Sequence, residues 1–475
     1  MRVLFVTSEV AGLYKRGGLA DVSYSLPVAL SKKGIRVAIA MPFYETISSK
    51  GAQCVGQLAI DYDRRRELVF IFRMMLPHSH IPVYLFRHPL FDSYDAKDIV
   101  ERFAFFSKAV AQLYLYSAET LGGPYDVVHC NDWHTALVPL LLGEQGKIGY
   151  RERGTIQSTL VKTVLTIHNL LYTGETGASI GLKLGLPRTL FHPFMTPLGR
   201  AVRLLEEGFV YADVISTVSP TYATELMRGI HGAHMPALMK KRGDAIIGIL
   251  NGIDEDVWDP KTDVALPVSY DKQTVHSKKL FIKQALRKAV KLEDIPVPLF
   301  GFVGRLEARQ KGVDLILKSV EKLDPDTYQL VILGTGNKKL VHRLEALVAR
   351  HKNIVFIHTF DERLARRIYA GADALLVPSK FEPCGLTQMI AMRYGTVPVV
   401  RKTGGLADSV IDGKTGFVFG PYTSAALTNA MNRFISLYTK SPKVFQTMID
   451  RVMRVDFSWR NQADQYVSMY KKLME

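Results

Sequence analysis

The chain has 475 residues, and 61 Lys and Arg against 45 Asp and Glu give it a formal net charge of +16 at pH 7. Hydrophobic residues make up 47% of the sequence and charged residues 22%, a composition that excludes disordered, collagen-like and coiled-coil proteins. No long uncharged apolar run occurs, so we expect no membrane span, and three cysteines are too few for a disulfide framework. These features predict a large cytoplasmic protein of two or three domains.

The first part of the chain predicts strands that alternate with helices. Short apolar runs predict strands at residues 3–7 and 35–41, and the residues between them have helical spacing over 19–30. Strands are typical of parallel α/β sheets when they alternate with helices in this way, and ligands then bind beyond the carboxyl ends of the strands. Further strands, each followed by polar residues, are expected at 126–129, 160–167 and 214–218.

A second series of predicted strands begins after residue 290. Its members are expected at 299–303, 329–333, 353–358, 374–377 and 397–400. Residues 251–277 are rich in Asp and Pro and weak in periodicity, so we expect them to connect the two series. The sequence therefore predicts an α/β protein with two domains, residues 1–250 and 251–457, that face each other across a cleft.

The positive charge is spread over short basic clusters, such as Arg64-Arg65-Arg66 and Lys278-Lys279. Such clusters usually lie on solvated helix faces. A nucleic-acid-binding protein more often has one basic stripe with interleaved aromatic residues, and none is visible here. We therefore expect no nucleic-acid partner, and a positive field instead suits a small anionic substrate.

Two basic loops each leave a predicted strand and enter a predicted helix. In Lys15-Arg16-Gly17-Gly18, the glycines let the backbone approach a ligand, and a helix start presents free N–H groups to an anion. Taken alone this motif is weak, because Gly-Gly before a helix is often only a tight turn. The second loop runs from Arg305 to Lys311, and its cations could neutralise a diphosphate leaving group without a metal. The alternative is a solvated surface loop.

Polar residues follow three other predicted strands. After residue 377, Gly385 permits a close approach to a ligand, the amides of residues 385–387 could bind an anion, and Glu382 could hold sugar hydroxyls. Asp132 and His168, each just past a strand end, suit a sugar site. A zinc site made by His129, Cys130 and His134 is disfavoured, because their spacing matches no standard ligand pattern.

Together these motifs resemble those of bacterial-type glycogen and starch synthases. The resemblance covers essentially the whole chain and implies the GT-B fold of glycosyltransferase family 5, with two Rossmann-like doubly wound domains and a final helix, about 458–475, that returns to the first domain. The strings that carry it are K-R-G-G-L-A-D-V from Lys15, T-I-H-N from Thr166, L-N-G-I-D-E-D-V-W-D-P from Leu250, F-E-P-C-G-L-T-Q from Phe381 and T-G-G-L-A-D-S-V from Thr403.

The resemblance implies a hexosyltransferase with no cofactor and no metal. It would move glucose from a nucleotide diphosphate glucose to the non-reducing end of an α-1,4-glucan and retain the anomeric configuration. ADP-glucose is favoured as the donor, because bacterial relatives mostly prefer it. The alternatives are a synthase that uses UDP-glucose, a related transferase with another acceptor, and a non-catalytic glucan-binding protein.

The resemblance also implies roles for individual residues. Its diphosphate-stabilising pair is Arg305 and Lys311, with one residue more between them than usual, and we expect Arg309 in that loop to point into water. Asn131 stands where the family often has histidine. The other implied roles are donor binding by Lys15, Gly18, Asp21, Gly385, Leu386 and Thr387, sugar contact by His168, an acid beside the glucose at Glu382, and candidate sugar or acceptor contacts at Asp132, Asn169 and Tyr94.

Overall fold

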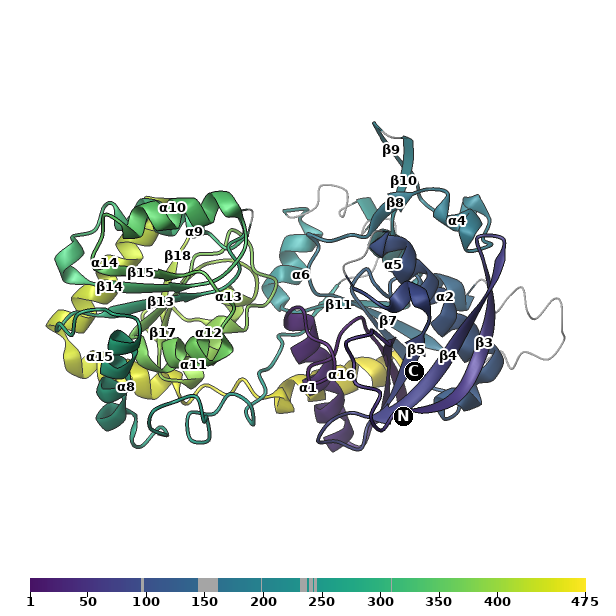
Figure 1. Cartoon of the computed structure of the whole chain (residues 1–475), viewed down its shortest axis with the longest axis horizontal. Helices are drawn as coiled ribbons and strands as arrows, with labels where there is room; N and C mark the ends of the chain where they lie inside the picture. Colours follow the sequence, from purple (N-terminus) through teal and green to yellow (C-terminus); the bar gives the residue numbers. More distant parts are fainter. Residues whose placement is uncertain are drawn as a thin grey trace. The chain divides into compact units, whose positions relative to one another are not determined.

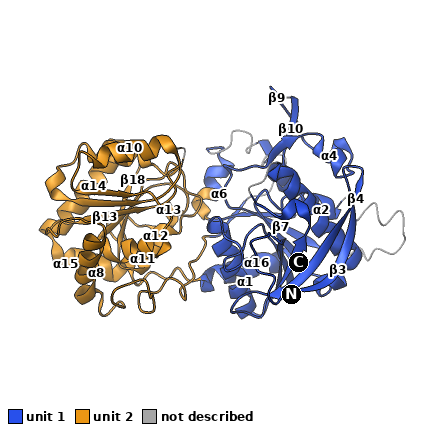
Figure 2. Cartoon of the chain, viewed as in Figure 1, with its two compact units in different colours: residues 1–218, 223–249, 459–475 blue, residues 219–222, 250–458 orange. Residues whose placement is uncertain are grey.

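The structure is a computed structural model, and it describes residues 1–94, 98–143, 161–197, 199–230, 237–238, 242, 246–308 and 310–475. The chain forms two compact units (Figures 1 and 2). The first unit contains residues 1–218, 223–249 and 459–475, and the second contains residues 219–222 and 250–458. Within the described ranges, no helix is long and apolar enough to cross a membrane.

The first unit is built on a nine-stranded sheet. Its strands are β1 (Arg2–Val6), β2 (Arg36–Pro42), β3 (Gln53–Tyr62), β4 (Arg65–Met75), β5 (Pro82–Arg87), β6 (Val127–Asn131), β7 (Lys162–Ile167), β11 (Val214–Thr217) and β12 (Ile247–Gly248). Their order in the sheet is β12-β11-β7-β6-β1-β2-β5-β4-β3. All pairs from β12 to β5 are parallel, and β4 and β3 add two antiparallel strands at one edge. The strand order therefore reverses between β1 and β6.

Helices cover both faces of this sheet. Successive residues of each strand point to opposite faces, so the buried apolar strands present core side chains on both sides. On one face, Val3 and Phe5 belong to a core cluster that includes residues of helices α1 and α16. On the other face, the ring centroids of Phe86 and of Phe106 in α2 are 5.4 Å apart. The helices of this unit are α1 (Gly18–Lys32), α2 (Ile99–Ser117), α4 (Ile180–Lys183), α5 (Leu204–Tyr211) and α16 (Trp459–Met474). Helix α6 (Pro220–Met227) begins with three residues of the second unit and continues in the first. A small antiparallel sheet contains β8 (Glu175–Gly177), β9 (Phe194–Thr196) and β10 (Gly199–Arg203).

The second unit has a six-stranded, all-parallel sheet. Its strands are β13 (Leu299–Val303), β14 (Gln329–Leu333), β15 (Ile354–Ile357), β16 (Ala374–Val377), β17 (Val397–Arg401) and β18 (Phe417–Phe419). They lie in the order β15-β14-β13-β16-β17-β18, the doubly wound order of dinucleotide-binding folds. The helices are α8 (Val275–Ala289), α9 (Val313–Val320), α10 (Lys338–Val348), α11 (Glu362–Gly371), α12 (Thr387–Arg393), α13 (Gly404–Ser409), α14 (Ser424–Lys440) and α15 (Pro442–Val452).

The prediction of an α/β fold with parallel sheets is confirmed, and every strand predicted from an apolar run is present. The hairpin of β3 and β4 was not predicted. Its turn residues, Asp63 and Arg64, have φ values of 49° and 63°, where Asn-Gly or Asp-Gly is the usual sequence signal. The basic triplet that begins at Arg64 therefore lies in a hairpin and not on a helix.

The expectation that basic pairs face water is wrong for Lys279. Its ammonium is buried in the second unit, 2.9 Å from the carbonyl oxygen of Ala370 and 2.8 Å from Oγ1 of Thr396. Burial lowers the pKa of Lys279 to about 7. Lys279 therefore links helix α8 to α11 and to Thr396, the residue that precedes β17. A pair of adjacent lysines in the sequence gives no sign that one of them is buried.

Candidate functional site

The two basic loops, Asp132 and Glu382 follow the strands that flank the point of strand reversal in each sheet. In an open α/β sheet, a crevice forms there, outside the carboxyl ends of the two strands that flank the reversal. In the first unit these ends lead to the loop of Lys15 and to Asp132. In the second unit they lead to the loop from Arg305 to Lys311 and to Glu382. Each unit thus brings its candidate residues to the position where α/β sheets bind ligands.

Glu9 organises the glycine-rich loop of the first unit. Its Oε2 atom accepts hydrogen bonds from the backbone N–H groups of Arg16, at 2.5 Å, and Gly17, at 2.9 Å. Burial raises the pKa of the Glu9 carboxyl, and these two N–H groups oppose that rise. Lys15 pairs with Asp21 at 2.7 Å, and both side chains are partly exposed. Sequence analysis missed Glu9, because its partners are backbone groups that no motif identifies.

Asp132 ties the end of β6 to the end of β7. It has a left-handed backbone conformation, with φ of 57°, and its Oδ1 accepts the N–H groups of His168 at 2.7 Å and Asn169 at 3.3 Å. Burial raises the pKa of Asp132 to about 7, although both N–H groups lower it. The structure therefore brings Asp132, His168 and Asn169 together, with Asp132 bound to the backbone of the other two.

Asn131 sets the tautomer of His168. The Asn131 amide nitrogen donates to the carbonyl oxygens of Val6 at 3.0 Å and His129 at 3.3 Å, so the amide oxygen must be the atom that faces His168. Nε2 of His168 lies 3.0 Å from that oxygen and therefore carries the proton. Desolvation lowers the pKa of His168 to about 3, which keeps the ring neutral. Its Nδ1 is then a hydrogen-bond acceptor.

Tyr94 lies beside the glycine-rich loop. Its hydroxyl is 2.7 Å from Nε2 of His134, and its ring stacks on Tyr14 with the centroids 5.7 Å apart. The guanidinium of Arg16 lies 4.8 Å from the centre of the Tyr94 ring. Tyr94 is thus placed among residues of the loop, and its hydroxyl already contacts His134.

His129 has a structural position. One ring nitrogen is 2.7 Å from the hydroxyl of Tyr470 in α16, and the other is 2.6 Å from Oγ1 of Thr166. Both nitrogens are therefore engaged within the protein. Across the described residues there is no group of three His, Cys, Asp or Glu side chains placed to hold a metal ion.

The second unit brings Lys311 and Glu382 into contact. The Lys311 ammonium is 2.7 Å and 3.0 Å from the two carboxylate oxygens of Glu382, and the Ser379 hydroxyl donates to the same carboxylate at 2.8 Å. The Glu382 side chain is 7% exposed and that of Lys311 is 21% exposed. Arg305 is exposed and forms no ion pair with any described residue. Arg309 lies outside the described residues.

Glycines hold the loop that follows Glu382. Gly385 has φ of +74°, and Nε2 of Gln388 donates to its carbonyl oxygen at 2.7 Å. A Cβ atom on Gly404 would lie 1.9 Å from the carbonyl oxygen of Glu382, so the glycine lets helix α13 pack directly beneath the loop. Gly385, Leu386 and Thr387 remain partly exposed. Burial raises the pKa of the Cys384 thiol to about 12, which argues against a nucleophilic role.

Comparison with known proteins identifies the family. Residues 2–241 match the family described as starch synthase catalytic domain, and residues 284–447 match glycosyl transferases group 1. The glycogen synthase of Kosmotoga olearia is 39% identical over 100% of this chain and 98% of its own, and that of Thermodesulfovibrio yellowstonii is 36% identical over the same shares.

A solved structure agrees with these relatives. The catalytic domain of Starch Synthase IV from Arabidopsis thaliana, bound to ADP and acarbose, is similar with a TM-score of 0.86 and 30% identity over 99% of each chain. The predicted GT-B fold and the resemblance to glycogen and starch synthases are confirmed. The chain therefore belongs to the glycogen and starch synthase family of GT-B glycosyltransferases.

Proposed function

We propose that this glycosyltransferase moves glucose from ADP-glucose to the non-reducing end of an α-1,4-glucan and retains the anomeric configuration. The observation that carries the proposal is the likeness over 99% of the chain to a starch synthase solved with ADP and acarbose. ADP is the product that remains after ADP-glucose has lost its glucose. The likeness therefore favours ADP-glucose over UDP-glucose as the donor.

In the proposed reaction, the bond between the anomeric carbon and the diphosphate oxygen breaks, and the diphosphate gains negative charge. We assign Arg305 and Lys311 to this charge, because cations aimed at it stabilise the transition state more than the ground state. An ammonium has three N–H donors, and Glu382 offers Lys311 two oxygen partners, so one donor remains for a phosphate oxygen. The backbone N–H groups of Gly385, Leu386 and Thr387 would bind the same diphosphate.

Glu382 is assigned to orienting the glucose. Both of its oxygens face the Lys311 ammonium, and Ser379 donates to one of them, so neither is free to attack carbon. The 4-hydroxyl oxygen of the acceptor would instead attack the anomeric carbon from the side that the diphosphate leaves. Its proton would pass to a diphosphate oxygen, which balances the exchange of one C–O bond for another.

Residues of the first unit would hold the donor and the sugar. We assign Lys15, Gly18 and Asp21 to the donor, and the exposed pair of Lys15 and Asp21 can rearrange at little cost. The free Nδ1 of His168 would accept a hydrogen bond from a glucose hydroxyl. Asp132, Asn169 and Tyr94 remain candidate contacts for the sugar or the acceptor.

One assay tests this proposal and its alternatives. Release of nucleoside diphosphate is measured with ADP-glucose and with UDP-glucose, each with and without glycogen. We expect release that depends on glycogen and is faster with ADP-glucose. Labelled glucose should enter the glycogen and be recovered as maltose after digestion by a β-amylase, which removes α-1,4-linked units from non-reducing ends. Faster release with UDP-glucose, or release that needs no glucan, would contradict the proposal.

A further inference from the structure

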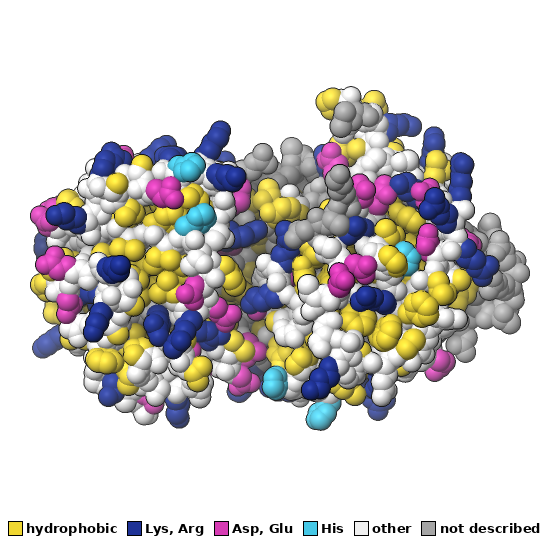
Figure 3. Space-filling model, in the orientation of Figure 1, with side chains coloured by type: hydrophobic (Ala, Val, Ile, Leu, Met, Phe, Trp, Pro, Cys, Tyr) yellow, Lys and Arg dark blue, Asp and Glu magenta, His cyan; other side chains and the backbone are white. Residues whose placement is uncertain are grey.

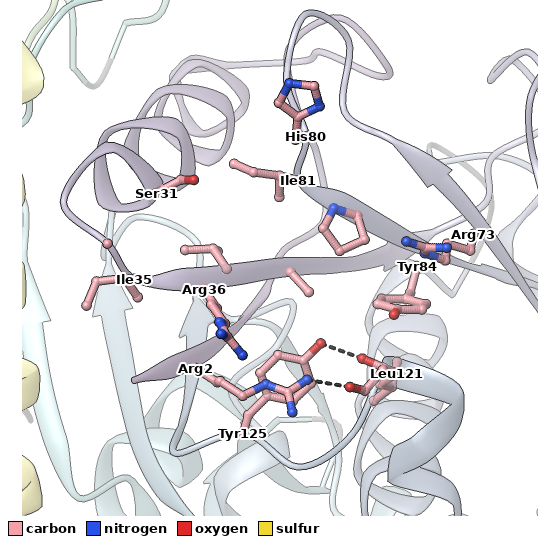
Figure 4. A pocket seen from close by; sticks show the side chains of 15 residues that line it. Arg2, Ser31, Ile35, Arg36, Arg73, His80, Ile81, Tyr84, Leu121 and Tyr125 are labelled. Atoms are coloured by element: carbon pink, nitrogen blue, oxygen red, sulfur yellow. Dashed lines mark hydrogen bonds between the residues drawn. The ribbon is translucent and has the colours of Figure 1, made fainter.

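A cavity of about 560 Å³ lies at the amino ends of strands β1, β2 and β5 (Figure 4). Arg2 and Arg36 begin the first two of these strands, and Pro82 begins the third. The residues assigned to the donor in this unit follow the carboxyl end of β1 instead, and the sugar candidate Asp132 follows that of β6. The cavity and the candidate functional site therefore lie at opposite edges of the same sheet.

The strand register explains why this region is hollow. Arg2 is aligned with Arg36 in the parallel pair β1–β2, and Arg73 is opposite Tyr84 in the antiparallel pair β4–β5. Residues two apart on a strand share a face, so Ala38 lies on the same side of β2 as Arg36. All five residues line the cavity. Because the alanine side chain is small, the long side chains around it enclose an open space.

The lining is strongly basic. It contains Arg2, Arg36, Arg73 and His80, and none of the described residues that line it is Asp or Glu. Neither Arg36 nor Arg73 forms an ion pair with any described residue, and both side chains are exposed. On the face drawn in Figure 3, by contrast, basic and acidic side chains lie interspersed. The cavity thus concentrates positive charge without a counter-charge of its own.

Arg2 is held in place by contacts within the cavity wall. Its guanidinium donates to the carbonyl oxygen of Gly122 at 2.5 Å and lies 4.9 Å from the ring centre of Tyr125 (Figure 4). The nearby carboxylate of Asp126 accepts the backbone N–H of Arg2 at 2.7 Å and does not line the cavity. A guanidinium fixed in this way loses little further freedom when it binds an anion.

We propose that this cavity binds a small phosphomonoester of a sugar. Guanidinium groups bind phosphate oxygens in pairs, and the near-dianion of a phosphomonoester matches the adjacent charges of Arg2 and Arg36. Tyr84 and Tyr125 are 4% and 6% exposed, so their rings close the floor of the cavity, and the open space above that floor has room for the carbon skeleton of the ester. A volume of about 560 Å³ lies in the range of small-molecule sites.

Equilibrium dialysis with a labelled hexose 6-phosphate tests the proposal, with ADP present in excess so that the transfer site is occupied. We expect saturable binding of one equivalent to the full-length protein. Arg36→Ala should weaken it roughly tenfold to hundredfold, because one charge-assisted contact is lost, and adding Arg73→Ala should weaken it further. Arg66→Ala is the matched control, since Arg66 is exposed on β4, the strand of Arg73, but does not line the cavity.

The outcomes that overturn the proposal are equally direct. The proposal is wrong if the unchanged protein shows no saturable binding of the hexose phosphate. It is also wrong if Arg36→Ala leaves that binding intact, or if Arg66→Ala weakens the binding as much as Arg36→Ala does. Inorganic phosphate should compete more weakly than the hexose phosphate, and equal affinity would overturn the assignment to a sugar ester. Thermal unfolding of each variant shows that the fold is retained. The readout is binding alone, so it stands or falls independently of the donor and acceptor proposed above.

Discussion

The contact between Lys311 and Glu382 predicts that the two residues act as one unit during glucose transfer. Three variants test this. Lys311→Met keeps most of the aliphatic chain and removes the charge, and Glu382→Gln keeps the shape and removes the charge. The third is the double variant. If the contact persists in the transition state, the losses of the two single variants cannot be independent.

The structure sets the size of the effect. Each single change should cost about 3–4 kcal/mol of transition-state stabilisation, roughly 10²–10³-fold in turnover, by analogy with the loss of an oxyanion donor. Two unit charges 2.7 Å apart attract each other by roughly 6 kcal/mol at an effective dielectric constant of about 20, which is an upper limit. Lys311 is 21% exposed and Ser379 also supports Glu382, so we expect about 2 kcal/mol to be shared. The double variant should then lose about 4–6 kcal/mol, not the 6–8 kcal/mol of independent roles.

The assay is the initial rate of ADP release at saturating ADP-glucose and glycogen, with ADP affinity measured separately for each variant. Glu382→Gln should lower turnover by more than it weakens ADP binding, because its carboxylate is assigned to the glucose. Lys318→Met, an exposed change on the helix that follows Lys311, is the control and should leave turnover unchanged. Losses that add within about 0.5 kcal/mol would refute the shared role, and so would a damaging control.

Four further predictions concern the same sites. Arg305→Ala should cost about 3–4 kcal/mol in turnover and Arg309→Ala about 1 kcal/mol or less, and the reverse order would show that the longer loop shifts the register. The pKa of Asp132 is raised from 3.8 to about 7, so the folded protein holds this proton more tightly than the unfolded chain does. The free energy of unfolding should therefore fall, relative to that of Asp132→Asn, as the pH rises from about 4 to about 7. Urea unfolding that shows the same difference between the two proteins at every pH would contradict this. Asn131→Asp places a carboxylate beside His168 and should raise the pKa of that ring, so turnover should increase with pH near neutrality, and a profile like that of the unchanged enzyme would be inconsistent. Turnover should persist in EDTA, because Arg305 and Lys311 are the groups proposed to neutralise the diphosphate, and a loss that magnesium restores would disprove it.

Much of the fold could be predicted because both sheets leave a strong record in the sequence. Parallel strands are covered on both faces, so they appear as short apolar runs such as Leu299–Val303 and Ala374–Val377. Loops that follow such runs must lie at the carboxyl edge, which is why Arg305, Lys311 and Glu382 could be proposed as site residues without a structure. The hairpin of β3 and β4 left no such record, because it is largely exposed and its turn has no glycine.

The contacts within the candidate sites could not be predicted in the same way. Lys311 and Glu382 are 71 residues apart and meet because β16 pairs with β13 while the intervening strands β14 and β15 lie on the other side. Glu9 accepts hydrogen bonds from backbone N–H groups, which every residue type except proline has, so no motif identifies its partners. Asn131 sets the His168 tautomer through its amide oxygen, and these two residues meet only because their strands are neighbours in the sheet. The basic cavity depends on the alignment of Arg2 with Arg36. The sequence alone therefore determined the α/β class, the family and the loops that carry charge, since local patterns specify strands and their ends. Which of those charges meet was decided only by the tertiary structure, because strand order sets the neighbours of each loop.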